Sequence, residues 1–199
     1  MASAAKPNPA KRANNRNDAL LDAAAHLFAS KGYRETTMRD IAVASGMLPG
    51  SIYYHHGSKA NLLLAVYEKG VDGLCARFDA ALAGGDAPWS RLEAVLVAHF
   101  EIVLDQSDYA RVLIRVLPDQ LPDLAGALSD LRNTYEDRLA AVIDALPLEA
   151  SVNPRMLRFL LLGAANWSQT WYRTGAETPA DIAQHFLNIV RQPVEASDG

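Results

Sequence analysis

One segment restricts the fold more than any other, because it marks the ends of two short helices. It spans residues 36–59 and reads TTMRDIAVASGMLPGSIYYHHGSK. Thr37 and Asp40 have the spacing of a capping box, in which a hydroxyl and a carboxylate satisfy the backbone donors at a helix start. Gly46 can adopt the left-handed conformation that ends a helix, and Pro49 suits the first turn of the next. The segment predicts two short helices joined by a tight turn.

The start of the second predicted helix is suited to reading DNA. Its small residues Pro49, Gly50 and Ser51 let the backbone approach a surface closely, and no carboxylate occurs between 46 and 60. Such a helix can reach base edges in the major groove, with flanking donors for phosphates. The donors that follow are Tyr53, Tyr54, His55 and Lys59. The alternative is an αα-hairpin of a helical bundle, in which the tyrosines merely pack.

A long series of residues at fixed spacing matches a known motif: Thr36, Thr37, Arg39, Asp40, Ile41, Ala42, Gly46, Gly50, Ile52, Tyr53, His55, Ser58 and Lys59. In this series the segment resembles the helix-turn-helix of the TetR family of bacterial transcriptional regulators. Two departures occur. His56 stands where the family usually has a phenylalanine, and Leu48 and Pro49 replace the usual polar residues.

With this resemblance, the segment is expected to bind double-stranded operator DNA. Thr37 and Tyr53 are expected on phosphates and Lys59 near the backbone, with Gly50, Ser51 and Tyr54 at or near base edges. The complete set of expected DNA-binding residues is Thr37, Arg39, Pro49, Gly50, Ser51, Tyr53, Tyr54, His55 and Lys59.

The charge distribution agrees with a DNA-binding N-terminal part. The whole chain of 199 residues has a net charge of −4. Up to Lys59 it carries eight Lys and Arg against four Asp and Glu, a net +4, and the remainder carries eleven against nineteen, a net −8. This asymmetry is typical of a basic DNA-binding head on an acidic body.

Residues 1–16 have no hydrophobic periodicity and are expected to form a disordered basic arm. The arm either contacts phosphates or the minor groove, or is a solvated tail. Asn17 is expected to cap a first helix that ends at Gly32. Residues 17–60 would then form a three-helix head.

The rest of the chain also shows helical periodicity, and no strand pattern competes with it. Helices are expected over residues 58–82, 88–104, 108–117, 124–146, 154–175 and 178–190, with a proline-broken connection at 117–123. The prediction is an all-α, TetR-like chain of about nine helices, in which residues 61–192 form a ligand-binding and dimerisation domain.

Several other classes of protein are not supported. Cys75 is the single cysteine, which excludes an intramolecular disulfide and fits the cytoplasm. No apolar run is long enough for a membrane span, and the N-terminus lacks the apolar stretch of a signal peptide. The five histidines are not spaced as metal ligands, and no catalytic or phosphate-cradling motif occurs. No enzyme activity, cofactor, metal or membrane association is therefore expected.

A second motif lies near the C-terminus: Trp167, Trp171, Tyr172, Arg173, Gly175, Thr178, Ile182, Ala183 and Phe186. It resembles the pattern of TetR-type repressors of fatty-acid, phenylacetate and steroid catabolism. The resemblance implies a repressor that a small hydrophobic effector, such as an acyl-CoA thioester, releases from its operator. Another hydrophobic effector, or none, remains open.

Polar residues on apolar helices suggest where an effector binds. Asn166 and Gln169 lie one turn apart, as do Arg111 and Arg115, and a buried amide or guanidinium needs a partner. We expect Asn166 to hold a polar atom of the effector and an arginine to meet a phosphate, unless both arginines are solvated surface charges. The expected ligand-binding residues are Phe78, Phe100, Tyr109, Arg111, Leu113, Leu117, Tyr135, Asn166, Trp167 and Gln169.

The last two helices are expected to form a two-fold homodimer that presents two heads about 34 Å apart, one turn of DNA. The expected interface residues are Gly163, Ala164, Trp171, Ile182, Phe186 and Ile189. Two alternatives are a ligand-independent architectural DNA binder and a helical protein-interaction module. The long apolar body argues against the first, and the helix-turn-helix motif against the second.

Overall fold

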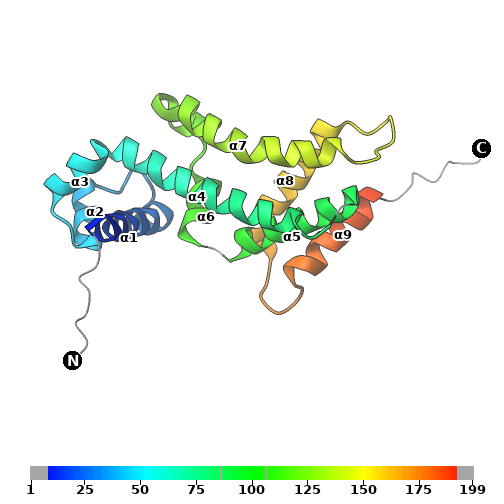
Figure 1. The fold of residues 1–199 in the computed structure, drawn as a ribbon, viewed down its shortest axis with the longest axis horizontal. Helices are drawn as coiled ribbons and strands as arrows, with labels where there is room; N and C mark the ends of the chain where they lie inside the picture. Colours follow the sequence, from blue (N-terminus) through cyan, green and yellow to red (C-terminus); the bar gives the residue numbers. More distant parts are fainter. Residues whose placement is uncertain (1–8, 86, 106, 192–199) are drawn as a thin grey trace, which may run out of the picture. The chain divides into compact units, whose positions relative to one another are not determined.

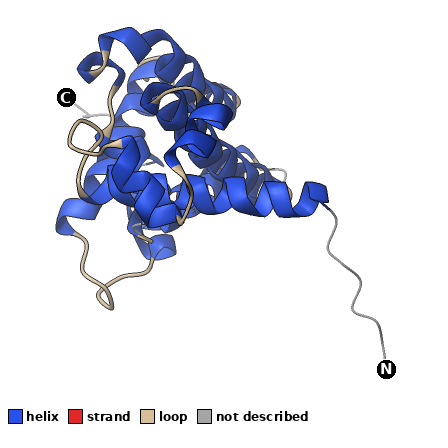
Figure 2. Ribbon diagram, turned by 90° about the vertical axis from the view of Figure 1, so that its left-hand side faces the viewer, coloured by secondary structure: helices blue, strands red, loops and turns tan. Residues whose placement is uncertain are grey.

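The computed structural model describes residues 9–85, 87–105 and 107–191, and all regular structure within them is helical (Figures 1 and 2). This confirms the all-α prediction. The α-helices are α1 Pro9–Ser30, α2 Met38–Ser45, α3 Pro49–His56, α4 Lys59–Leu82, α5 Pro88–Leu104, α6 Asp108–Arg115, α7 Ala125–Asp144, α8 Pro154–Trp171 and α9 Pro179–Arg191. Two 3-10 turns, Pro118–Gln120 and Pro122–Leu124, form the proline-broken connection.

The two-helix segment folds as the sequence predicts. The Asp40 amide donates to the Thr37 hydroxyl over 3.1 Å, and the Thr37 amide donates to the Asp40 carboxylate over 2.9 Å, which completes the capping box. Gly46 ends α2 with a φ of 66°, in the left-handed region that favours glycine. Pro49 is the first residue of α3, and the fully buried Ile52 anchors this helix.

The first helix begins earlier than predicted. Since α1 starts at Pro9, residues 9–16 are helical and not a disordered arm, and the prediction for residues 1–8 falls outside the described residues. A proline suits the first helical position, and Ala, Lys and Arg at 10–13 are strong helix formers. Asn17 is consequently an interior residue of α1 and not its N-cap. Its side-chain oxygen accepts a hydrogen bond from His56 Nε2 over 3.1 Å.

The chain divides into two compact units. The first combines the chain up to Gly70 with Asp108–Leu131, and the second combines Val71–Ser107 with the chain from Arg132 onward. The unit boundary therefore differs from the predicted division after residue 60, because α6 packs against α1 within the first unit. A Cβ atom added at Gly70 would lie 3.2 Å from Leu113 Cγ, so the glycine allows α4 and α6 to approach closely in this unit.

In the second unit, α5 packs against α8 and α9. The caps of these helices explain their starts. The Asn153 side chain accepts from the amides of Arg155 and Met156 at the start of α8. At the start of α9, Thr178 and Asp181 exchange hydrogen bonds in a second capping box. The apolar side chains that fill this unit include Leu92, Val95, Leu96, Phe100, Leu139, Ile143, Leu157, Leu161, Ala183 and Leu187.

Candidate nucleic-acid interface and buried polar cluster

The outer face of α3 is an accessible, uncharged surface. Ile52 is buried, so the helix positions two residues away on either side, Gly50 and Tyr54, point outward. The Tyr54 side chain is 86% exposed, and Leu48 at the N-cap is 79% exposed. The small exposed residues Pro49 and Gly50 at the start of α3 therefore lie between two exposed larger side chains, Leu48 and Tyr54.

The predicted DNA-binding residues lie between the N-cap of α2 and the start of α4, and most are exposed. The exposed ones are Thr37, Arg39, Pro49, Gly50, Tyr53, Tyr54 and His55. Ser51 is half-buried. The Thr37 hydroxyl serves the capping box as an acceptor, so its proton remains available to a phosphate.

Lys59, which is expected near the DNA backbone, is bonded within the protein to the loop between α1 and α2. Its ammonium group donates to three backbone oxygens, those of Tyr33 at 2.9 Å, Arg34 at 3.2 Å and Thr36 at 2.8 Å. It also lies 4.5 Å from the centroid of the Tyr33 ring. Burial lowers the pKa of Lys59, an effect that the nearby Glu35 opposes. In this structure Lys59 holds the loop between α1 and α2 closed.

His56, which stands at the family's phenylalanine position, bonds α3 to α1. Its half-buried ring donates to Asn17 of α1, as described above, which ties the end of α3 to the first helix. Burial, and secondarily the neighbouring His55, lower the pKa of His56. The neutral ring therefore fits the packed position that the phenylalanine usually occupies.

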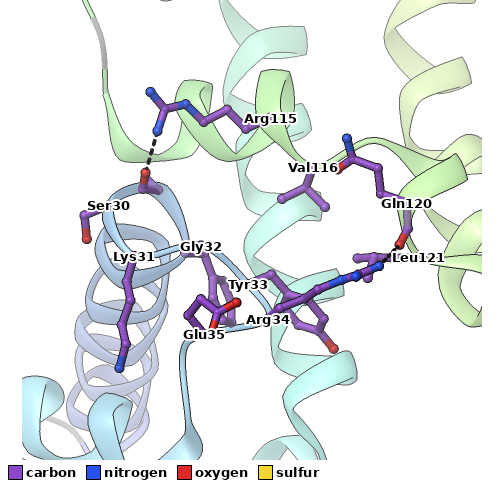
Figure 3. A pocket seen from close by; sticks show the side chains of 12 residues that line it. Ser30, Lys31, Gly32, Tyr33, Arg34, Glu35, Arg115, Val116, Gln120 and Leu121 are labelled. Atoms are coloured by element: carbon purple, nitrogen blue, oxygen red, sulfur yellow. Dashed lines mark hydrogen bonds between the residues drawn. The ribbon is translucent and has the colours of Figure 1, made fainter.

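The predicted effector arginines lie on the C-terminal end of α1. Arg115 donates to the Ala29 carbonyl over 3.0 Å and Arg111 to the same oxygen over 3.4 Å. The last carbonyls of a helix lack partners within it and attract cations, so both guanidinium groups have a structural use there. A cavity of about 400 Å³ lies in the first unit, and Arg34, Arg115 and Gln120 are among the residues that line it. Figure 3 shows these side chains, and Arg34 donates to the Gln120 carbonyl over 3.0 Å.

Further polar contacts continue along α1, and we call the whole set the α1–α6 seam. The Tyr109 hydroxyl donates to Asp22 over 2.6 Å, and Lys69 bonds both Asp18 at 3.0 Å and Asp22 at 3.2 Å. Burial alone would lower the pKa of Lys69, but bonds to Asp18, Tyr109 and Asp22 raise it. The seam is the set of contacts made by Asp18, Asp22, Ala29, Lys69, Tyr109, Arg111 and Arg115.

The second unit contains a buried polar cluster, the His99 cluster, made of His99, Tyr135 and Asn166. His99 Nδ1 lies 2.7 Å from the Tyr135 hydroxyl, and His99 Nε2 lies 3.2 Å from the Asn166 side-chain oxygen. An amide oxygen can only accept, so Nε2 carries the proton and the tyrosine hydroxyl donates to Nδ1. Burial lowers the pKa of His99 to about 4 and raises that of Tyr135. Both groups are therefore neutral near pH 7.

Sequence reasoning identified Tyr135 and Asn166 but missed His99. The signal was present, since His99 falls among Val95, Leu96, Phe100 and Val103 on the apolar side of its helix. A histidine in that setting needs polar partners from other helices. The spacing of the histidines along the sequence carries no information on such partners.

The remaining predicted effector residues are placed differently. Phe78 packs edge-on against Tyr135 at 5.7 Å between ring centroids, so it borders the His99 cluster. Phe100 is fully buried, whereas Trp167 is 67% exposed. Gln169 is half-buried and donates to the Asn166 backbone oxygen. Leu113 and Leu117 belong to the first unit and are half-buried there.

The predicted dimer residues fall into two groups. Ile182 is only 2% exposed and Phe186 packs on Phe100 at 5.3 Å, so both contribute to the core of a single chain. Gly163, Trp171 and Ile189 are exposed, and Ala164 is half-buried. One face of α8 carries an exposed stripe at helical spacing, formed by Met156, Phe159, Leu160, Gly163, Trp167 and Trp171.

Among residues 9–85, 87–105 and 107–191, no three His, Cys, Asp or Glu side chains lie close enough together to hold a metal ion. No helix in the same ranges combines the length and apolar character that crossing a bilayer requires.

The fold and the exposed helix-turn-helix agree with comparisons to known proteins. Residues 20–66 match the family of bacterial regulatory proteins of the tetR type, and residues 85–194 match the tetracyclin repressor-like C-terminal domain. The chain belongs to the TetR family. It is therefore a DNA-binding transcriptional regulator, as its helix-turn-helix motif predicts.

Individual relatives extend over almost the whole chain. The transcriptional repressor KstR2 of Rhodococcus jostii RHA1 is 30% identical over 187 residues, which cover 89% of this chain and 90% of that protein. The structure of the ketosteroid transcriptional regulator KstR2 of Mycobacterium tuberculosis is 26% identical, with a TM-score of 0.69 and coverage of 88% and 92%. AibR in complex with isovaleryl coenzyme A and operator DNA shares the fold at 23% identity, with a TM-score of 0.75 and coverage of 88% and 97%.

Proposed function

We propose that the protein is a cytoplasmic transcriptional repressor that leaves its operator when a small hydrophobic ligand, of the acyl-CoA thioester class, binds to the second unit. The observation that carries the DNA-binding half is the accessible, acid-free start of α3. Repression is supported by the likeness to KstR2, which is named as a repressor and matches over most of both chains.

The effector class rests on the C-terminal motif around Trp167, Trp171 and Tyr172. AibR, which shares the fold, has been seen with both isovaleryl coenzyme A and operator DNA, so one chain of this architecture can take both ligands. Within the second unit, Asn166 is the polar group that we assign to the effector. The His99 cluster occupies its side-chain oxygen and leaves its NH₂ group to donate to a carbonyl.

The ligand must bind more tightly to the state that cannot hold the operator than to the DNA-competent state, because only differential affinity shifts such an equilibrium. We assign the coupling to α4, whose residues belong to both units. We assign Arg111 and Arg115 to the packing of the first unit and not to the effector, because both already donate to the Ala29 carbonyl of α1.

We assign the dimer contact to the exposed stripe of α8 together with Ile189 of α9. Exposed apolar patches of this kind mark interaction sites, and a two-fold axis would let the same stripe serve both copies. Leu160→Asp places a charge on the stripe without touching the core, since Leu160 is 60% exposed. We expect monomers in sedimentation for this variant and dimers for Val152→Asp, a control outside the stripe. Wild-type monomer at micromolar concentration would contradict the assignment.

The test of DNA binding by α3 uses two serines in equivalent positions. Ser51 and Ser90 are each the third residue of a helix that begins with proline, so glutamate affects both helix ends alike. Ser51→Glu should abolish operator binding through repulsion of the phosphates, and Ser90→Glu should bind as the wild type does. Wild-type affinity of a correctly folded Ser51→Glu protein, verified by circular dichroism, would refute the proposal.

A further inference from the structure

The reading helix lacks the side chains that make strong pairwise contacts with bases. From 43 to 58 the sequence is VASGMLPGSIYYHHGS, with no Arg, Lys, Asn, Gln, Asp or Glu. Arg and Lys read guanine, Asn and Gln read adenine, and the acids accept from cytosine. Neither α3 nor the turn before it has a side chain that can make one of these base contacts. The helix can offer only single hydrogen bonds and apolar contacts.

Leu48 occupies a position that neither packing nor helix capping explains. It is the N-cap of α3, where Ser, Thr, Asp and Asn are preferred, and it makes no side-chain capping bond. Its side chain is 79% exposed, so it adds little to the core. An isobutyl group therefore projects from the end of the helix that, in a helix-turn-helix, contacts base edges.

The major groove presents one apolar group to such a side chain, the C5-methyl of thymine. We infer that Leu48 contacts the methyl group of a thymine in each operator half-site and sets the base preference there. This inference rests on the proposed function and adds the chemical feature of the operator that α3 selects. Tyr54, also on the outer face, contributes a single hydroxyl.

The experiment removes the methyl group from the DNA and the isobutyl group from the protein. A duplex is first selected from a random-sequence library with the full-length protein. Each thymine of a half-site is then replaced in turn by deoxyuridine, which lacks only the C5-methyl, and binding is followed by fluorescence anisotropy. One thymine in each half-site should weaken binding about fourfold on replacement, the value of one buried methyl group.

The Leu48→Ala protein should bind the thymine and deoxyuridine duplexes equally at that position. Val152→Ala, which shortens an exposed valine in the second unit, should keep the fourfold ratio. If every deoxyuridine duplex binds as tightly as its thymine parent, or if Leu48→Ala keeps the preference for thymine, the inference is wrong while the proposed function stands. If selection enriches no duplex, both are wrong.

Discussion

The α1–α6 seam of the first unit and the His99 cluster of the second unit both pair polar side chains from different helices, but they satisfy them differently. The seam uses charged groups at the surface, such as Lys69 and Arg115, which remain partly hydrated. The cluster uses neutral groups, and its His99 and Tyr135 side chains are buried. Because charges in water interact weakly and buried unpaired groups are costly, the two regions should respond very differently to mutation.

The largest effect should follow from breaking the buried cluster. His99→Leu leaves the Tyr135 hydroxyl and the Asn166 amide oxygen without their partner and should lower the free energy of unfolding by about 3 kcal/mol. Adding Tyr135→Phe to this variant should cost less than Tyr135→Phe alone, because the hydroxyl has already lost its acceptor. Chemical denaturation followed by circular dichroism measures both. Additive losses would show that the two groups are not coupled.

A smaller effect should appear in the pH dependence of stability that the buried His99 produces. His99 is neutral in the folded protein because its pKa is about 4, against 6.5 for an unperturbed histidine. Below pH 6.5 the unfolded state binds a proton that the folded state does not, so stability is lost as the pH falls towards 4. Between pH 7 and 5 this loss is about 2 kcal/mol.

His99→Gln provides the comparison for this pH dependence, since glutamine can still pair with both neighbours but does not titrate. Subtracting its unfolding free energy from that of the wild type at each pH cancels the contributions of other groups. A difference that stays constant between pH 7 and 5 would contradict the neutral, buried histidine.

The smallest effect should come from the seam. Arg115 is exposed, so its replacement by alanine should lower the free energy of unfolding by only about 0.5 to 1 kcal/mol. Arg173→Ala, an exposed arginine that bonds only the adjacent Tyr172 carbonyl, serves as the control and should cost less. A loss from Arg115→Ala as large as that from His99→Leu would remove the contrast between the two regions.

The sequence predicts features that depend on local interactions well, and features that depend on long-range interactions poorly. The ends of α2 and α3 were predictable because Thr37, Asp40, Gly46 and Pro49 act on their own backbone. The hydrogen-bond partners of long polar side chains were not predictable, because these partners lie on elements that are distant in the sequence. Lys59 bonds carbonyls 23 to 26 residues away, and Arg111 and Arg115 reach Ala29, more than 80 residues away.

The start of α1 and the unit boundary show two further limits of the sequence. Asn17 has the chemistry of an N-cap, but a helix can continue through asparagine when earlier residues propagate it, and here the side chain instead bonds His56. The packing of α6 against α1 cannot be predicted from hydrophobic periodicity, because the periodicity shows which face of a helix is buried and not which helix covers that face. The DNA contacts, the effector site and the dimer remain predictions.

Titrated release of the operator tests the central claim, that a ligand held by the second unit sets the DNA affinity of the head. The complex of the full-length protein with its selected duplex is titrated with acyl-CoA thioesters, the matching free acids and coenzyme A alone, and fluorescence anisotropy reports the bound fraction. The account predicts that a thioester releases the DNA at concentrations where its free acid and coenzyme A do not. Release by free acids alone would contradict the thioester assignment, and an unchanged bound fraction with every compound would contradict ligand control itself.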